Sequence, residues 1–375
     1  MSGIRNVARV ARLTSHAELF LSSAADESVA PEDFLTALGD SARALGVEIV
    51  ALDVFGALPA GGLMNHVRSE WPITWVGEAA RSGKSNAITT EAARNPKPVS
   101  ASAAQVWGVR GCAVRRIAIE GRVVGSVIED DAARYCRCGG LLPRDIEASP
   151  SGQTSQVFDR MEAALAQADM DFSHVVRTWF FNRDITSWYR EFNDARDEFF
   201  YARGVFDGIV PASTGMGGEN TAGAALIGGC LAIMPKTDAV AVRRVSSPLQ
   251  CPAFDYGSSF SRAVEIAAPD CRRLLVSGTA SIAPEGHTLY PGDASAQMDQ
   301  TLRVVEAILE SRGMGWEHAT RAVMYYKHAE YLAEFARQAA ALPDLPVVYV
   351  HNDVCRDDLL FEMELDAIEA NMGDA

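Results

Sequence analysis

Two segments of the chain match each other without a gap at a constant separation. Residues 156–181 align with residues 300–325. Identical pairs include Gln156 with Gln300, Glu162 with Glu306, Leu165 with Leu309, Met170 with Met314, His174 with His318, and Arg177 with Arg321. A fixed spacing of this kind predicts two copies of one structural unit.

Both copies show the same order of patterns. Each begins with apolar residues at helical spacing, for example Met161, Leu165 and Ala168 in the first copy. A turn, a β-rich run, a second helix and a closing strand follow, and another strand precedes the first helix. The second helices are expected at 188–200 and 331–342, the closing strands at 222–233 and 359–368, and the preceding strands at 135–139 and 274–278. Such a unit cannot bury both faces of its sheet alone, so we expect the copies to pack on each other.

Composition narrows the range of partners. The 375 residues carry a net charge of −15, which excludes the broad positive field of a nucleic-acid-binding surface. An anionic small molecule would require a few arginines to converge locally. Seven scattered cysteines do not form the framework of a secreted disulfide protein. The most apolar stretch, residues 222–234, is shorter than the ~20 residues that span a bilayer. These features predict a reduced, cytoplasmic protein without a membrane partner.

Several candidate motifs have plain structural interpretations. The tract Gly215–Gly218 lacks the Gly-Lys-Ser/Thr ending of a phosphate loop, so we expect a tight turn whose amides line a pocket. Cys136 and Cys138 have no second Cys or His pair at zinc spacing, so we expect no metal there and two buried thiols. The repeat-equivalent His174 and His318 are expected to cap the turn before a strand.

Acidic and apolar residues alternate near the C-terminus. Phe361, Met363 and Leu365 would face one side of a strand, and Glu362, Glu364 and Asp366 the other. One interpretation is an antiparallel strand with a solvated acidic face. The other places that face in the seam between the two copies, where burial would raise a carboxyl pKa and suit a general acid.

Two further residues are candidates for the same pocket. Cys355 lies seven residues before Glu362 in a polar turn. Arg262 ends the run Tyr256–Arg262 and is either a carboxylate-binding side chain or an exposed residue at the end of a strand. The sequence leaves both interpretations of Arg262 open.

An ordered set of short stretches resembles a known family. The stretches are Tyr135–Arg137, Arg177–Trp179, Pro211–Gly215, Phe260–Ala263, Ser277–Ala280 and Asp353–Glu364. The repeat unit resembles the RidA/YjgF fold, and the whole set is similar to the chorismatases, bacterial enzymes with two RidA-like halves that remove pyruvate from chorismate. The resemblance implies an α+β fold with two RidA/YjgF-like (chorismate-mutase-like) sheet-plus-helix domains packed as a pseudo-symmetric pair. We expect a helical N-terminal segment over residues 1–45 and the two domains over 46–245 and 246–375, the second carrying the catalytic residues.

The resemblance also implies a site. Glu362 falls on the family's proton-donating glutamate, and Cys355 and Gly278 match the subtypes that form hydroxybenzoates. It therefore implies a 3-hydroxybenzoate synthase that works through an arene oxide, uses chorismate as substrate and needs no metal or organic cofactor. The catalytic residues would be Glu362 and Cys355. The substrate-binding residues would be Arg262, Tyr325, Arg177, Thr214, Gly215, Gly278, Thr279 and Ala280.

Alternatives stay open at this point. The product could be 4-hydroxybenzoate, and the chain could be a monomer or a homo-oligomer. A RidA-type enamine or imine deaminase is less favoured, because no arginine follows Pro211 or Pro346 at the position that such activity uses. A binding protein without catalytic activity is the third possibility.

Overall fold

The computed structural model describes residues 4–26, 28–56, 58, 69–78, 102–342 and 345–370. Its strands and helices, in chain order, are β1 (Ile4–Arg12), β2 (Ala17–Ala25), α1 (Pro31–Ala44), β3 (Glu48–Gly56), β4 (Ile73–Val76), β5 (Ser102–Arg110), β6 (Arg115–Ile119), β7 (Arg122–Glu129), β8 (Ala133–Leu141), α2 (Pro150–Ala166), β9 (Val175–Asn182), α3 (Ile185–Ala202), β10 (Ala212–Gly217), β11 (Leu226–Pro235), β12 (Ala241–Val245), β13 (Ala263–Ala267), β14 (Cys271–Ala280), α4 (Ala294–Glu310), β15 (Ala319–Tyr326), α5 (Leu332–Ala339), β16 (Val347–His351) and β17 (Phe361–Ala370).

The strands form three sheets with the same internal order. The first sheet runs β1-β2-β5-β3-β4, the second β10-β9-β11-β8-β7-β6, and the third β12-β13-β14-β17-β15-β16. In each sheet the last strand in sequence lies centrally, between an antiparallel hairpin and a parallel pair. The three sheets are therefore three copies of one α+β unit.

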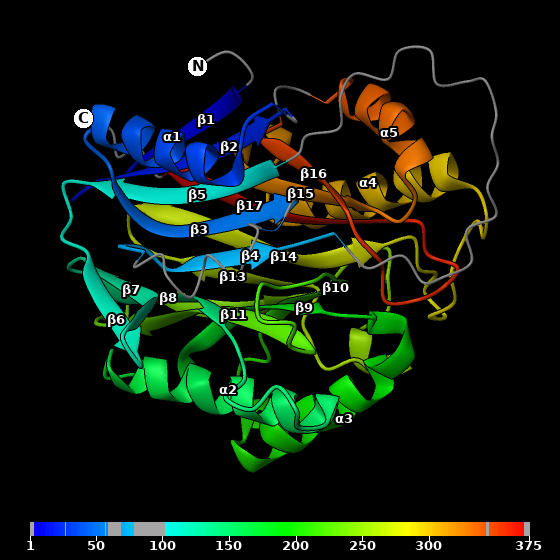
Figure 1. The fold of residues 1–375 in the computed structure, drawn as a ribbon, viewed down its shortest axis with the longest axis horizontal. Helices are drawn as coiled ribbons and strands as arrows, with labels where there is room; N and C mark the ends of the chain where they lie inside the picture. Colours follow the sequence, from blue (N-terminus) through cyan, green and yellow to red (C-terminus); the bar gives the residue numbers. More distant parts are fainter. Residues whose placement is uncertain are drawn as a thin grey trace.

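The sheets face one another, and the helices lie outside them (Figure 1). A core shared by all three sheets fills the interior and includes Phe55, Trp179 and Tyr325. Separate clusters join α1 to the first sheet, α2 and α3 to the second, and α4 and α5 to the third. Both faces of every sheet are thus covered, which removes the apolar face that one unit could not bury alone.

The predicted repeat agrees with the structure residue by residue. Helices α2 and α4 and strands β9 and β15 start and end at positions related by the spacing seen in the sequence. His174 accepts a hydrogen bond from the Asp171 backbone N–H, and His318 accepts the corresponding bond from Gly315, so both cap the turn as predicted. The expected α+β class with repeated sheet-plus-helix units is confirmed.

The N-terminal region differs from the expectation. The predicted helix is present as α1, but strands β1 and β2 precede it within residues 1–45. These strands pair with β5, which in turn pairs with β3, to make a third sheet rather than a helical appendage. Strand β12 lies before the expected boundary at residue 246 and belongs to the third sheet. The boundaries themselves stay predictions.

Among the described residues, no helix combines the length and apolarity that crossing a bilayer requires.

Candidate active site

A cavity of about 480 Å³ lies between the second sheet with α3 and the third sheet. Its walls include Tyr189 and Arg196 from α3, Gly215 from β10, Gly278 from β14 and Glu362 from β17. The segment 256–262 and the turn around Cys355 complete it. The cavity therefore lies in the seam between two copies of the unit.

Strands β10 and β14 are tied together at this seam. The Ser213 backbone N–H donates to Ser277 Oγ at 2.9 Å, and the Gly278 N–H donates to Thr214 Oγ1 at 3.1 Å. These bonds hold the two walls of the cavity at fixed spacing.

Glu362 is a buried acid. Its strand sends Phe361 and Met363 into the core under α4 and α5, while Glu362 faces the cavity. Burial, together with the nearby negative charge of Glu364, raises the pKa of Glu362 to about 8. The acidic face of this strand is buried in a seam and not solvated, and the carboxyl of Glu362 stays protonated at neutral pH.

Gly278 makes room for that carboxyl. A Cβ placed on Gly278 would overlap Glu362 Oε1 and would lie 3.2 Å from its carboxyl carbon. Because Gly278 has no side chain, the Glu362 carboxyl can lie where it does.

Three arginines line the cavity without a carboxylate partner. Within the described part of the chain, no carboxylate oxygen lies at ion-pairing distance from Arg196, Arg262 or Arg356. Arg262 donates to the Cys251 carbonyl and Arg356 to that of Gly286. Arg196 donates to Asn193 Oδ1 at 2.6 Å, and its buried Nε has no partner. In a chain of charge −15, this concentration of uncompensated guanidinium groups favours an anionic ligand.

Tyr256 lies between two of these guanidinium groups. The Cζ atoms of Arg262 and Arg356 lie 5.3 Å and 5.2 Å from the centroid of its ring. Cation–π contacts of this kind orient both arginines.

The thiol of Cys355 lies in the same cavity as a neutral group. Burial, followed by the negative charge of Glu362, raises the pKa of Cys355 to about 12. Tyr189 contacts this thiol, and burial raises the pKa of the tyrosine hydroxyl as well. Near Cys355 the cavity therefore offers uncharged hydrogen-bonding groups.

The predicted site residues divide into two sets. Those that line the cavity are Glu362, Cys355, Arg262, Gly215, Gly278 and Ala280. The others lie behind its wall. Arg177, Thr214 and Tyr325 point to Glu364, and Thr279 Oγ1 donates to the Ser277 carbonyl at 2.9 Å. The substrate-binding role of this second set stays a prediction, without a contact to the cavity.

Sequence reasoning missed several residues of the cavity. Arg196 and Tyr189 lie on α3, which the sequence predicted as a helix at 188–200 without assigning any of its residues to a site. Arg196 is buried, a rare state for an arginine, but no local pattern distinguishes it from an exposed one. Arg356 directly follows the candidate residue Cys355, and that adjacency was the one signal in the sequence that Arg356 could belong to the site.

The glycine tract differs from its prediction. Residues 215–217 continue strand β10, so the expected tight turn is wrong, and of the four only Gly215 lines the cavity. A Cβ on Gly217 would lie 2.7 Å from that of Asp353, so glycine serves close packing there. Cys136 and Cys138 are buried as predicted, and in the described residues no cluster of three His, Cys, Asp or Glu forms a candidate metal site.

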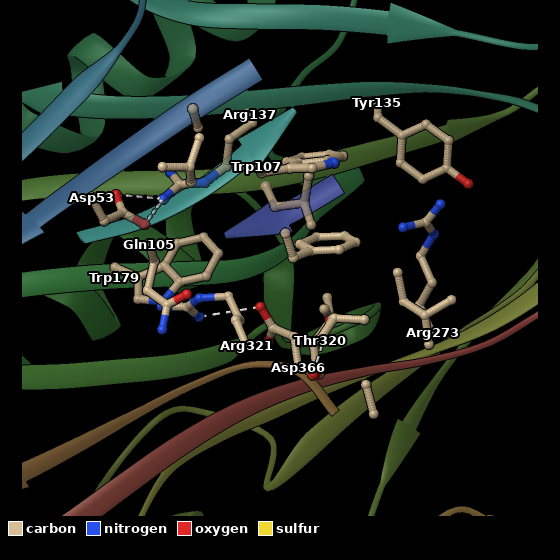
Figure 2. Close-up of a pocket in the computed structure, with 17 residues that line it drawn as sticks. Asp53, Gln105, Trp107, Tyr135, Arg137, Trp179, Arg273, Thr320, Arg321 and Asp366 are labelled. Carbon is tan, nitrogen blue, oxygen red and sulfur yellow. Dashed lines mark hydrogen bonds and ion pairs between the residues drawn. The ribbon is translucent and has the colours of Figure 1, made fainter. Parts of the chain in front are cut away.

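A second, smaller cavity of about 60 Å³ lies where the three sheets meet (Figure 2). Its guanidinium groups all have carboxylate partners. Arg137 bonds both oxygens of Asp53, Arg273 bonds both oxygens of Glu18, and Arg321 bonds Asp366 at 3.1 Å. The Arg137 guanidinium also lies 4.1 Å from the ring centroid of Trp179. This central cavity is held together by internal ion pairs.

The fold of this chain is similar to that of a chorismatase, and one of its three units matches a family model. Residues 131–217 match the family model described as endoribonuclease L-PSP. A crystal structure of a chorismatase superposes with a TM-score of 0.60 at 19% identity, covering 85% of this chain and 92% of the other.

Two curated relatives are similar to part of this chain. A chorismatase of Streptomyces rapamycinicus is 27% identical over 52% of this chain and 64% of its own length, so the match spans just under two thirds of that relative. A 3-hydroxybenzoate synthase of Streptomyces hygroscopicus is 29% identical over 61% of this chain and 73% of its own length. The chain is therefore similar to chorismatases over part of their length, and one of its three units matches the endoribonuclease L-PSP family model.

Proposed function

We propose that the protein is an enzyme that removes pyruvate from chorismate and forms 3-hydroxybenzoate. The observation that carries this proposal is a single cavity that combines a neutral carboxylic acid, Glu362, with three arginines that lack carboxylate partners. Chorismate has two carboxylates for the arginines and an enol ether for the acid. The relatives named chorismatase and 3-hydroxybenzoate synthase support the same activity.

Glu362 would start the reaction. Its proton goes to the methylene carbon of the enol ether, which becomes a methyl group and leaves an oxocarbenium ion. The bond between the ring carbon and the ether oxygen then breaks, and the oxygen departs as the ketone oxygen of pyruvate. A carboxylic acid with a pKa near the working pH is suited to this proton transfer.

The neighbouring ring hydroxyl would displace pyruvate. Its oxygen bonds to the ring carbon that pyruvate leaves, and its proton passes to the Glu362 carboxylate. The acid is thereby restored, and no water is consumed. Opening of the resulting arene oxide and loss of a ring proton give the aromatic product. The Cys355 thiol is uncharged at neutral pH. It therefore acts beside this ring as a small hydrogen-bond donor and not as a thiolate nucleophile.

The arginines would hold the two carboxylates. Arg262 and Arg356 are oriented by Tyr256, and Arg196 lines the same cavity from α3. Bidentate pairing of a guanidinium group with each carboxylate would fix both the position and the orientation of chorismate in the cavity. A fixed ring keeps the enol methylene beside Glu362.

The test is incubation of the purified protein with chorismate, with pyruvate followed by a coupled reduction and the ring product compared with standards by chromatography. We expect stoichiometric pyruvate and 3-hydroxybenzoate. A dihydroxycyclohexadiene acid or 4-hydroxybenzoate would overturn the product assignment. Unchanged chorismate, in a protein whose unfolding is cooperative, would overturn the activity.

A further inference from the structure

Glu364 stands two residues after Glu362 on the same face of β17. Side chains at positions i and i+2 of a strand point the same way, about 7 Å apart along the strand. Glu362 lines the seam cavity, whereas Glu364 is completely buried behind it. Glu364 is therefore a carboxylate adjacent to the acid and out of reach of a ligand.

Two sheets supply cations to Glu364. Arg177 from β9 donates to one oxygen at 2.7 Å, and Arg321 from β15 donates to the other at 2.5 Å. The Trp179 indole N–H donates at 3.0 Å and the Thr214 hydroxyl also bonds this carboxylate. Burial alone would raise the pKa of Glu364, but the two guanidinium groups outweigh it and hold the pKa below its ordinary value. Glu364 is thus a fixed anion.

Glu362 has the opposite surroundings. Its carboxyl has no hydrogen bond or ion pair to any of the described residues. The charged and titratable groups facing it are Glu364 on its own strand, Arg177 on β9, Tyr189 on α3, Arg262 before β13, Tyr325 on β15, and Cys355 and Arg356 before β17. Of these, Glu364 is the carboxylate, so among the neighbouring charges it opposes ionisation of Glu362 most directly, and it adds to the larger effect of burial.

We propose that Glu364 is a positioning residue that keeps the proton on Glu362, because its fixed negative charge repels a second carboxylate on the same strand face. It also fixes the wall beside the acid, since Thr214 binds Glu364 and accepts the Gly278 N–H. This inference rests on the proposed function for its role in catalysis, but the protonation of Glu362 is measurable without substrate.

Asp366 provides a matched control. It lies on the same face two residues further along, about 13 Å from Glu362, and it also bonds Arg321. Glu364→Gln and Asp366→Asn each remove one carboxylate and one partner of Arg321. The two variants differ in the distance of the lost charge from Glu362, and Glu364→Gln alone also removes the carboxylate partner of Arg177.

The first measurement is the pH profile of pyruvate release. The basic limb reports loss of the proton from Glu362, and removal of a nearby anion makes that loss easier. We expect Glu364→Gln to move the limb to lower pH by about 1–2 units, with the low-pH rate retained. Asp366→Asn should move it by less than half as much. A uniform loss of rate with an unmoved limb, or equal shifts in both variants, would overturn the proposal.

A second variant should move the basic limb of the pH profile in the opposite direction. Arg321→Gln leaves Glu364 as an anion with one guanidinium fewer, so the limb should move to higher pH. This variant also tests the proposal if Glu364→Gln does not fold. A shift to lower pH in Arg321→Gln would contradict it.

Infrared titration without chorismate separates this inference from the proposed activity. The carbonyl band of a protonated carboxyl, identified by its loss in Glu362→Gln, should disappear near pH 8 in the parent protein and at lower pH in Glu364→Gln. If the band shifts as expected while chorismate is not consumed, the proposed function fails and the role of Glu364 stands. If chorismate is consumed and the band does not shift, the role of Glu364 fails.

Discussion

The two cavities contain similar side chains and differ in how their charges are paired. In the central cavity, Arg137 and Arg273 each bind both oxygens of a buried carboxylate. In the seam cavity, Arg196 and Arg262 face the empty space without such a partner. A compensated arginine stabilises the assembly of sheets, whereas an uncompensated one is available to a ligand. The pairing of the charges, and not the residue types, distinguishes the binding site from the structural junction.

The largest expected effect is on the acid of the seam cavity. Glu362→Gln keeps the size of the side chain and removes the transferable proton. We expect the rate of pyruvate release to fall by about 10²–10⁴-fold, because general acid catalysis typically contributes that much. Unchanged turnover in this variant would refute the mechanism.

Arginine replacements test the comparison directly. Arg137→Met leaves Asp53 buried without its partner, so the free energy of unfolding should fall by about 3–5 kcal/mol. Arg196→Met removes no ion pair, so the unfolding midpoint should hold while KM for chorismate rises by about 10–100-fold. Denaturant titration and steady-state kinetics on both variants measure the two effects. A loss of stability in Arg196→Met equal to that in Arg137→Met would remove the distinction between the cavities.

A smaller effect should follow from crowding the acid. In Gly278→Ala the new methyl group overlaps the present position of Glu362 Oε1, so the carboxyl must move and kcat should drop by about tenfold. Gly215→Ala is the control, because its Cβ would meet Tyr189 at an ordinary 3.8 Å. Similar kinetics for the two alanine variants would show that the space beside Glu362 is not used.

The smallest expected effect is the pH dependence of the parent protein. Glu362 acts in its protonated form, and a pKa of about 8 keeps that form dominant at pH 7 and halves it at pH 8. The rate should therefore decline by about twofold over that interval and by tenfold per unit well above it. A rate that falls between pH 5 and 6 instead would mean an ordinary glutamate pKa.

Much of the fold was predictable because local patterns determine it. The spacing between residues 156–181 and 300–325 located α2, α4, β9 and β15, and the turn-capping role of His174 and His318 followed from their equivalence. The alternation around Glu362 gave the strand and its two faces. The first sheet was missed because its segments share too little sequence with the other two copies, although its strands follow the same order.

The sequence by itself thus determined the repeated unit, the strand that carries the three acidic residues and the candidacy of Glu362, Cys355 and Gly278. Only the tertiary structure decided which acid is neutral and which is ionised. Arg177 reaches Glu364 across 187 residues of sequence and from a different sheet, and no local pattern records that approach. Charge state depends on burial and on neighbours in space, so two glutamates in one short motif acquire opposite electrostatic roles only when the second and third sheets close around them.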